Sequence, residues 1–119
     1  MTKHDQMRRL QQVAGLLFDS KLVHLKTAAR AMQETKNHLA DLVALPALPD
    51  ELPKIAMHVA ELRYERWADA RRVELNLTLA RQTAEWLDAR DEARLAFGKT
   101  QALDAVKARM NAAAARRCL

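Results

Sequence analysis

The side chains that could carry chemistry in this chain are four histidines, one cysteine and a short Gly-Lys-Thr sequence. Gly98-Lys99-Thr100 matches the end of a phosphate-binding loop, but such a loop also needs a preceding β-strand and a glycine five residues before Gly98. That position is Ala93, in a stretch whose composition predicts helix. We therefore expect no phosphate site, and interpret Gly98 as a helix position that tolerates glycine or allows a bend.

The histidines lack the paired spacing of a metal site. They are His4, His24, His38 and His58. The one helical i, i+4 pair of ligand types that includes a histidine is Glu34 with His38, and two ligands do not complete a zinc site. Cys118 has no second cysteine in the chain and no histidine placed to activate it. The sequence predicts a protein that is not an enzyme and has no catalytic residue, metal or cofactor.

Composition predicts an all-α fold. The chain has 119 residues, of which half are hydrophobic and 29% are charged. Alanine, leucine, arginine and glutamate favour helix, whereas the β-branched and aromatic residues that favour strands are sparse. Five aromatic residues offer little bulk for a thick globular core. A thin core between two helices in one domain is the expected architecture.

The prolines predict where the chain turns back. Pro46, Pro49 and Pro53 are the only prolines, and they stand close together. Proline lacks a backbone donor and clashes with the preceding helical turn, so a cluster of prolines breaks a helix. We expect a single helical-hairpin domain over residues 1–119, with a helix at 3–44, a proline-rich turn at 45–52 and a longer helix at 53–117.

Steps of three and four residues predict which side chains face the other helix. In the first helix these are Leu10, Val13, Leu17, Leu25, Ala28, Met32, Thr35, Leu39 and Leu42. In the second they are Ile55, Val59, Leu62, Ala70, Val73, Leu77, Ala80, Ala84 and Leu87, with Arg66 as a polar gap. The pattern predicts an antiparallel coiled-coil hairpin.

The unequal lengths of the helices predict an unpaired C-terminal segment. At about 1.5 Å per residue the first helix is roughly 60 Å long and the second nearly 100 Å, which leaves some 25 residues without a partner in the first helix. This segment contains the apolar residues Leu95, Phe97, Leu103, Val106 and Met110. Residues 98–119 also carry five basic side chains against Asp104 alone. We expect the segment to bind something else.

Two tryptophans and two leucines lie mostly off the predicted core positions of the second helix. They are Trp67, Leu75, Leu79 and Trp86. Either they belong to a second buried face, with Trp67 against the first helix and Trp86 near Leu10 or Val13, or they contact a partner protein. The predicted partner-binding residues are these four together with Phe97, Lys99, Leu103, Lys107 and Arg109.

The distribution of charge predicts a cytoplasmic protein that is not inserted into a membrane. Charged residues interrupt every hydrophobic stretch, so no run of about 18 apolar residues exists. The N-terminal residues lead into a charged amphipathic pattern rather than an apolar signal sequence.

Part of the second helix resembles a known family. The segments are Trp-Ala-Asp-Ala-Arg-Arg at 67–72, Leu-Asn-Leu-Thr-Leu-Ala at 75–80, Trp86, and Ala-Arg-Leu-Ala-Phe-Gly-Lys-Thr-Gln-Ala-Leu at 93–103. Over residues 60–105 they resemble the C-terminal arm of the flagellar FliJ and injectisome YscO proteins of type III secretion. Members of that family are antiparallel two-stranded coiled coils, similar to the central stalk of rotary ATPases.

The resemblance implies protein partners. In the family, the paired terminal ends enter a hexameric export ATPase ring, and the body of the hairpin contacts the export gate and escorts chaperones. Residues 99–117 would then be the part that enters the ring. Trp67, Leu75, Leu79 and Trp86 would face the gate or a chaperone.

Two other functions fit the residues. In the first, two hairpins pair as a homodimer into a four-helix bundle that acts as a scaffold or a chaperone-like module. In the second, the basic chain, with a pI near 9.8, binds nucleic acid. Nucleic-acid binding is the less favoured, because residues 53–97 have balanced charge and no basic groove with aromatic side chains is apparent.

Overall fold

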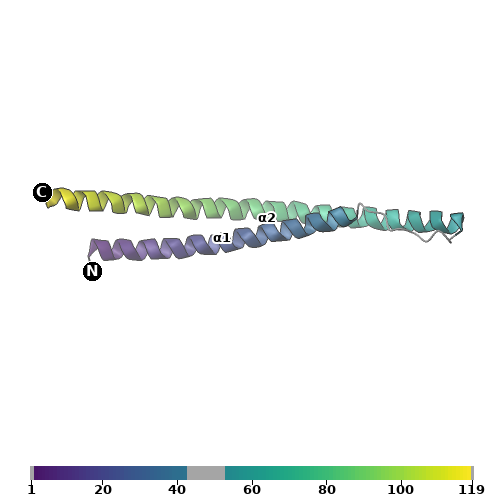
Figure 1. Cartoon of the computed structure of the whole chain (residues 1–119), viewed down its shortest axis with the longest axis horizontal. Helices are drawn as coiled ribbons and strands as arrows, with labels where there is room; N and C mark the ends of the chain where they lie inside the picture. The colour runs from purple at the N-terminus through teal and green to yellow at the C-terminus, as the bar shows by residue number, and fades with distance from the viewer. Residues whose placement is uncertain (1, 43–52, 119) are drawn as a thin grey trace. The chain divides into compact units, whose positions relative to one another are not determined.

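A computed structural model of the chain describes residues 2–42 and 53–118. They form two helices, α1 (Lys3–Asp41) and α2 (Lys54–Arg117), and no strand occurs within these two ranges (Figure 1). The predicted fold class, an antiparallel helical hairpin with the longer helix second, is confirmed. The predicted turn at 45–52 and the predicted end of the first helix at residue 44 lie outside the described residues.

Local sequence explains where each helix starts. At the first turn of α1, the Thr2 hydroxyl accepts a hydrogen bond from the backbone N–H of Asp5 at 3.2 Å, which satisfies one of the free donors of the first turn. Pro53 stands directly before α2, and its carbonyl accepts the N–H of Met57 at 3.0 Å. Proline suits this position because it has no N–H to leave unpaired. No proline follows in α2, so nothing stops the helix before its end.

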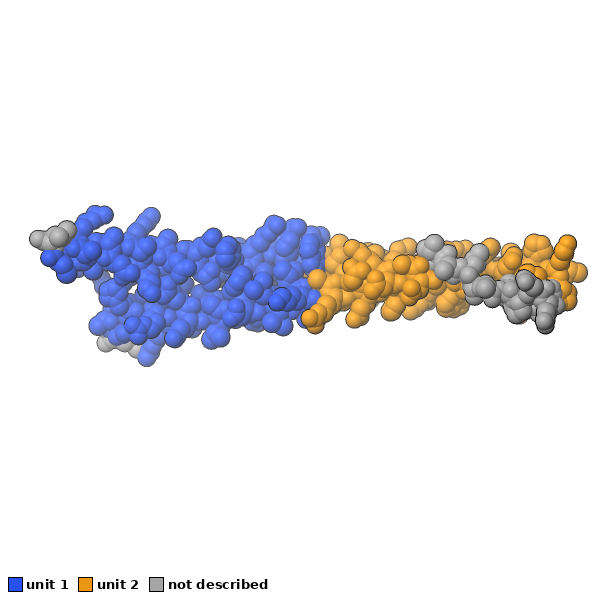
Figure 2. Space-filling model, viewed as in Figure 1, with its two compact units in different colours: residues 1–28, 86–119 blue, residues 29–85 orange. Residues whose placement is uncertain are grey.

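The chain divides into two compact units (Figure 2). Unit 1 contains residues 1–28 and 86–119, and unit 2 contains residues 29–85. Each unit therefore holds a part of α1 and a part of α2.

Contacts between the helices fix the antiparallel register within unit 1. Gln11 Nε2 donates to Asp104 Oδ1 at 2.9 Å. Seven residues later in α1, the ring of Phe18 lies 5.5 Å, centroid to centroid, from Phe97, which is seven residues earlier in α2. Because equal steps in opposite directions connect the two contacts, the N-terminal part of α1 runs beside the C-terminal part of α2.

This register shows that the predicted unpaired C-terminal segment is wrong. Phe97 and Asp104 contact α1, and Met110 lines the same hollow as Lys3 and His4. The prediction assumed that pairing starts directly at the prolines. In unit 2, however, the carbonyl of Leu42 meets Arg72, 30 residues later in the chain. It is the first turns of α2, at residues 54–61, that extend past the last described residue of α1.

The core between the helices follows a seven-residue repeat. In α1, and at Leu42 directly after it, the buried residues are Met7, Ala14, Thr35 and Leu42, which are separated by multiples of seven. In α2 the same holds for the buried residues Ala68, Leu75, Ala89 and Ala96, and Ala93 is also buried. Most of these buried apolar side chains are alanines, which lets two helical backbones approach closely. The core is therefore a thin coiled-coil seam.

The predicted core positions are right in part of α1 and wrong in α2. Thr35 and Leu42 are buried, and Leu25, Ala28, Met32 and Leu39 are partly buried. Leu10, Val13 and Leu17 are 54%, 64% and 41% exposed. All nine residues predicted for α2, together with Arg66, are exposed. The prediction followed the most hydrophobic side chains, whereas close packing selected alanines on the other side of α2.

Helix α2 continues through Gly98 without a break. A methyl group added at Gly98 would meet nothing within 4 Å, and no residue among those described has a positive φ. Gly98→Ala is therefore expected to raise the free energy of unfolding by about 0.5–1 kcal/mol, because alanine loses less backbone entropy in a helix. Urea denaturation followed by circular dichroism measures this. A loss of stability would mean that the helix needs glycine at this position.

Candidate interaction surfaces

The structure separates the predicted partner-binding residues into core and surface. Leu75 is 5% exposed and packs with Leu42 and Ala68, while Leu39 and Tyr64 pack against this cluster. Its side chain therefore leaves no surface for a partner. Leu79, Trp86 and Leu103 are partly buried.

The aromatic residues occupy two kinds of position. Trp86 is partly buried, and the guanidinium carbon of Arg90 lies 5.5 Å from its ring centroid, within range of a cation–π interaction. Trp86 belongs to unit 1 with residues 86–119, and Leu10 and Val13 are exposed, so it does not complete a core around them. Trp67 is 56% exposed and its ring lies 5.8 Å from that of Tyr64 on the same helix. Trp67 therefore presents apolar surface to solvent.

The predicted residues near the C-terminus are mostly accessible. Phe97 contacts Phe18 but keeps 47% of its surface exposed. Lys99, Lys107 and Arg109 are exposed. These four residues belong to unit 1, in which the N-terminal part of α1 lies beside the C-terminal part of α2.

An exposed apolar stripe runs along α2 in unit 2. We call it the outer stripe, and it consists of Ile55, Val59, Leu62, Ala70, Val73, Leu77, Ala80 and Ala84. Ile55 is 80% exposed and Leu77 is 69% exposed. The steps of three and four residues place the stripe on one helix face, nearly opposite the buried Ala68 and Leu75. Helix α2 thus carries two apolar faces, of which α1 covers one.

A charged pair lies beside the core of unit 1. Lys21 Nζ is 3.0 Å from Glu92 Oε2. The hydrogen bond and the charge of Lys21 hold the pKa of the Glu92 carboxyl below its usual range, with a smaller contribution from the nearby His24 and against some desolvation. The pair of Lys21 and Glu92 therefore joins the two helices of unit 1.

The lowered pKa of Glu92 predicts an acid-sensitive contribution to stability. A carboxyl whose pKa is lower in the folded than in the unfolded state stabilises the fold above its unfolded pKa, and this stabilisation is lost as pH falls through the folded value. Glu92→Gln is expected to make the free energy of unfolding less dependent on pH below about pH 5. Denaturation midpoints measured across pH test this. Lys21→Met should reduce the pH dependence in the same way. The double variant should reduce it no more than either single variant does, and additive effects of the two substitutions would contradict the pairing.

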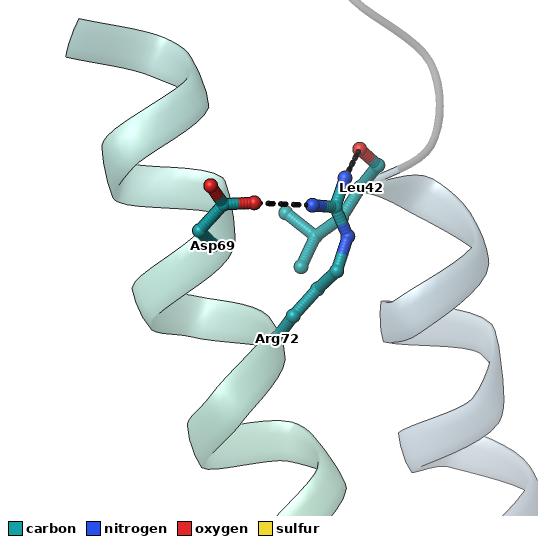
Figure 3. Close-up of polar contacts among 3 residues, drawn as sticks. All are labelled: Leu42, Asp69 and Arg72. Atoms are coloured by element: carbon teal, nitrogen blue, oxygen red, sulfur yellow. Dashed lines mark hydrogen bonds and ion pairs between the residues drawn. The ribbon is translucent and has the colours of Figure 1, made fainter.

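Polar contacts also connect the two chain segments of unit 2. The hydroxyl of Thr35, a buried residue, donates to Gln82 Oε1 at 2.6 Å. Arg72 donates to the carbonyl of Leu42 at 3.2 Å, and its other nitrogen lies 2.7 Å from Asp69 Oδ1 (Figure 3). The last carbonyls of a helix lack partners within that helix. Arg72 therefore caps the end of α1 from the neighbouring helix.

Removing this cap is expected to cost more stability than removing a surface ion pair. Arg72→Met keeps much of the aliphatic packing but loses the charged hydrogen bond, so we expect a loss of about 1–2 kcal/mol. Arg71 is the matched control, because its contact with Glu74 is an exposed pair within one helix; Arg71→Met should change stability by less than about 0.5 kcal/mol. Urea denaturation of both variants measures these changes. Equal losses of stability in the two variants would argue against a capping role of Arg72.

The candidate chemical groups of the sequence do not form a cluster. Thr100 of the Gly-Lys-Thr sequence donates its hydroxyl to the Phe97 carbonyl of its own helix at 2.7 Å. Within residues 2–42 and 53–118, no three ligand-type side chains lie close enough together to hold a metal ion. Over the same residues, neither helix has an apolar stretch that could cross a membrane.

Comparisons of the sequence and of the structure with known proteins identify no relative. No family model matches the chain, and neither the curated proteins nor the solved structures include a significant match.

Proposed function

We propose that this protein is a non-catalytic coiled-coil stalk or adaptor of a type III export apparatus, flagellar or injectisome. Its partners would be the hexameric export ATPase, the export gate and chaperones, and it would act in the cytoplasm without inserting into a membrane. The proposal starts from the resemblance of residues 60–105 to the FliJ and YscO proteins.

One observation carries this proposal: the N-terminal part of α1 is paired with the C-terminal part of α2 in unit 1. Gln11 contacts Asp104, and Lys3 lines the same hollow as Arg117. A stalk of this family places its paired terminal ends in the ATPase ring, so it needs a helix pair and not a single helix at that end. The pairing supports this arrangement better than the unpaired segment that the sequence suggested.

Charge supports the same assignment. Seven basic side chains of unit 1 lie close to the chain ends, namely Lys3, Arg8, Arg9, Lys107, Arg109, Arg116 and Arg117. A helix pair that needs only shape and charge can transmit an asymmetric contact to a symmetric ring without a cofactor. Exposed Trp67, in unit 2, would be available to the gate or to a chaperone.

A pull-down against the cognate hexameric export ATPase tests the assignment. Deleting residues 98–119 would also remove the partners of the first turns of α1, so charge reversal is the cleaner change. Lys107→Glu with Arg109→Glu is expected to abolish or strongly weaken binding. Arg63→Glu with Arg66→Glu, at exposed positions of unit 2, is the matched control and should bind normally. Binding that resists the first pair of substitutions would exclude the stalk assignment.

The outer stripe favours a second candidate function, a homo-oligomeric helical bundle. Exposed aliphatic side chains at coiled-coil spacing are suited to pack against the same stripe of a second copy. Sedimentation analysis separates the two functions, because a stalk would be monomeric and a bundle dimeric. In the bundle, Leu77→Glu would convert the dimer to a monomer while the helix content is unchanged.

A further inference from the structure

Two rows of side chains lie along the same side of unit 1. Lys21 Nζ lies 3.0 Å from Glu92 Oε2 across the helix pair, which marks this side, and His24, three residues after Lys21, is a neighbour of Lys21 on the surface of α1. Seven and fourteen residues before His24 stand Leu17 and Leu10, and seven and fourteen residues after Glu92 stand Lys99 and Val106. Because a seven-residue step keeps a side chain on the same face of a coiled coil, these residues continue the two rows toward the chain ends.

This side of unit 1 is apolar and accessible. Leu10 is 54% exposed, Leu17 41% and Val106 42%. Val13, three residues from Leu10, is 64% exposed, and Leu95, four residues before Lys99, is 69% exposed. Residues three and four apart are neighbours on a helix surface. The aliphatic side chains of both helices thus lie along one side of unit 1, and we call this side the apolar-basic face.

Beyond the Lys21–Glu92 pair, the charges on this face toward the chain ends are all positive. Lys99 lies between the aliphatic residues of α2, and Lys3 and Arg109 lie toward the chain ends. At the described positions of these rows between Lys3 and Leu17 and between Leu95 and Arg116 there is no aspartate or glutamate. Asp5, Asp19 and Asp104 occupy other heptad positions, which do not belong to these two rows. The face therefore combines exposed apolar area, which a partner could bury, with positively charged side chains toward the chain ends.

We propose that the apolar-basic face binds an amphipathic helix of a partner protein, with aliphatic residues on its contact side and aspartate or glutamate along its edges. The seven-residue spacing of both rows is the repeat into which the side chains of a third helix pack. Lys99 and Arg109 would pair with acidic edges, which fixes the choice of partner. The inference goes beyond the stalk assignment and does not rest on it.

The composition of the face favours an acidic helix over nucleic acid. Phosphates would pair with the basic residues, but they would leave the exposed leucines and valines in water. Proteins that bind single strands also stack bases on aromatic side chains, and none of Leu10, Val13, Leu17, Leu95 and Val106 is aromatic.

Binding to synthetic peptides tests the proposal without any export component. The probe is a fluorescent four-heptad peptide with leucine at positions a and d and glutamate at e and g; a second peptide carries lysine in place of glutamate. Fluorescence anisotropy with the full chain is expected to show tighter binding of the acidic peptide, by at least about tenfold. Equal affinity for both peptides, or no binding of the acidic one, would overturn the proposal.

Substitutions locate the binding surface. Val13→Asp and Lys99→Glu should each weaken binding of the acidic peptide by about tenfold or more. Gln12→Asp and Arg94→Glu are matched controls, because both positions are exposed and stand on the other side of the heptad pattern. They should leave binding within about twofold, as expected of residues outside an interface. Controls that weaken binding as much as the test variants would contradict the assigned face.

Two further ligands exclude other partners. Duplex DNA of random sequence and phosphatidylserine vesicles are tested with the same variants, and circular dichroism checks that each variant keeps its helix content. Tighter binding to DNA or to vesicles than to the acidic peptide, lost in Val13→Asp and Lys99→Glu, would show that the partner is not a helix. Failure of the peptide test while the export ATPase still binds would reject this inference and leave the stalk assignment in place.

Discussion

Leu75→Ala is expected to lower the free energy of unfolding by about 2–5 kcal/mol, whereas Leu77→Ala should change it by less than about 0.5 kcal/mol. The two leucines are two residues apart in the same helix, so intrinsic helix propensity cancels in the comparison. Leu75 is 5% exposed and Leu77 is 69% exposed. Truncating Leu75 removes apolar contacts with Leu42 and Ala68 and leaves a cavity, but truncating Leu77 removes surface that water already covers.

Urea denaturation followed by far-ultraviolet circular dichroism measures both changes, with an unchanged slope as evidence that the unfolding remains cooperative. The comparison also discriminates between two assignments of the core, because the sequence pattern placed Leu77 in it and the structure places Leu75. A larger loss at Leu77 than at Leu75 would contradict the register of the helices in unit 2. Similar large losses would mean that the outer stripe is also buried, for example in a dimer.

Ala89→Leu is expected to destabilise the chain by about 1–3 kcal/mol through overpacking. Ala89 is 1% exposed, the lowest value among the buried apolar residues described, so added side-chain atoms must push the helices of unit 1 apart. Leucine and alanine both favour helix, so propensity does not account for such a loss. Ala108→Leu is the matched control, since Ala108 is an exposed residue of the same unit.

Thermal and urea unfolding of these two variants provide the measurement. The control should stay within about 0.5 kcal/mol of the parent. A stabilised Ala89→Leu variant would mean that the alanine core is underpacked and that the backbones lie farther apart than in this structure. The expected loss, in contrast, would show that the small side chains set the distance between the helices.

The fold could be predicted from the sequence because the relevant signals are local. The three prolines and the scarcity of strand-forming residues are properties of short segments, and they suffice to predict two helices, one on each side of the prolines. The core of α2 could not be predicted in the same way. Hydropathy ranks Val73 and Leu77 above Ala89 and Ala93, yet close packing against α1 favours the alanines.

The register could not be predicted either, because it depends on pairs that are distant in sequence. The contacts of Thr35 with Gln82 and of Leu42 with Arg72 become evident only when both helices are placed. Among the candidate partner-binding residues, the sequence could identify exposed charges such as Lys99. It could not separate Leu75, a core residue, from exposed Trp67, because both lay off the predicted core positions.

The register also implies an order for forming the hairpin. The contact of Arg72 with Leu42 closes 30 residues of chain, whereas that of Gln11 with Asp104 closes 93. Loop-closure entropy grows with the logarithm of loop length, so the longer closure costs about 1 kcal/mol more from an unfolded chain. Once unit 2 has formed, its helix pair holds the remaining segments near each other and most of that extra cost disappears. Pairing of the helices is therefore expected to begin in unit 2 and to proceed step by step toward the two chain ends.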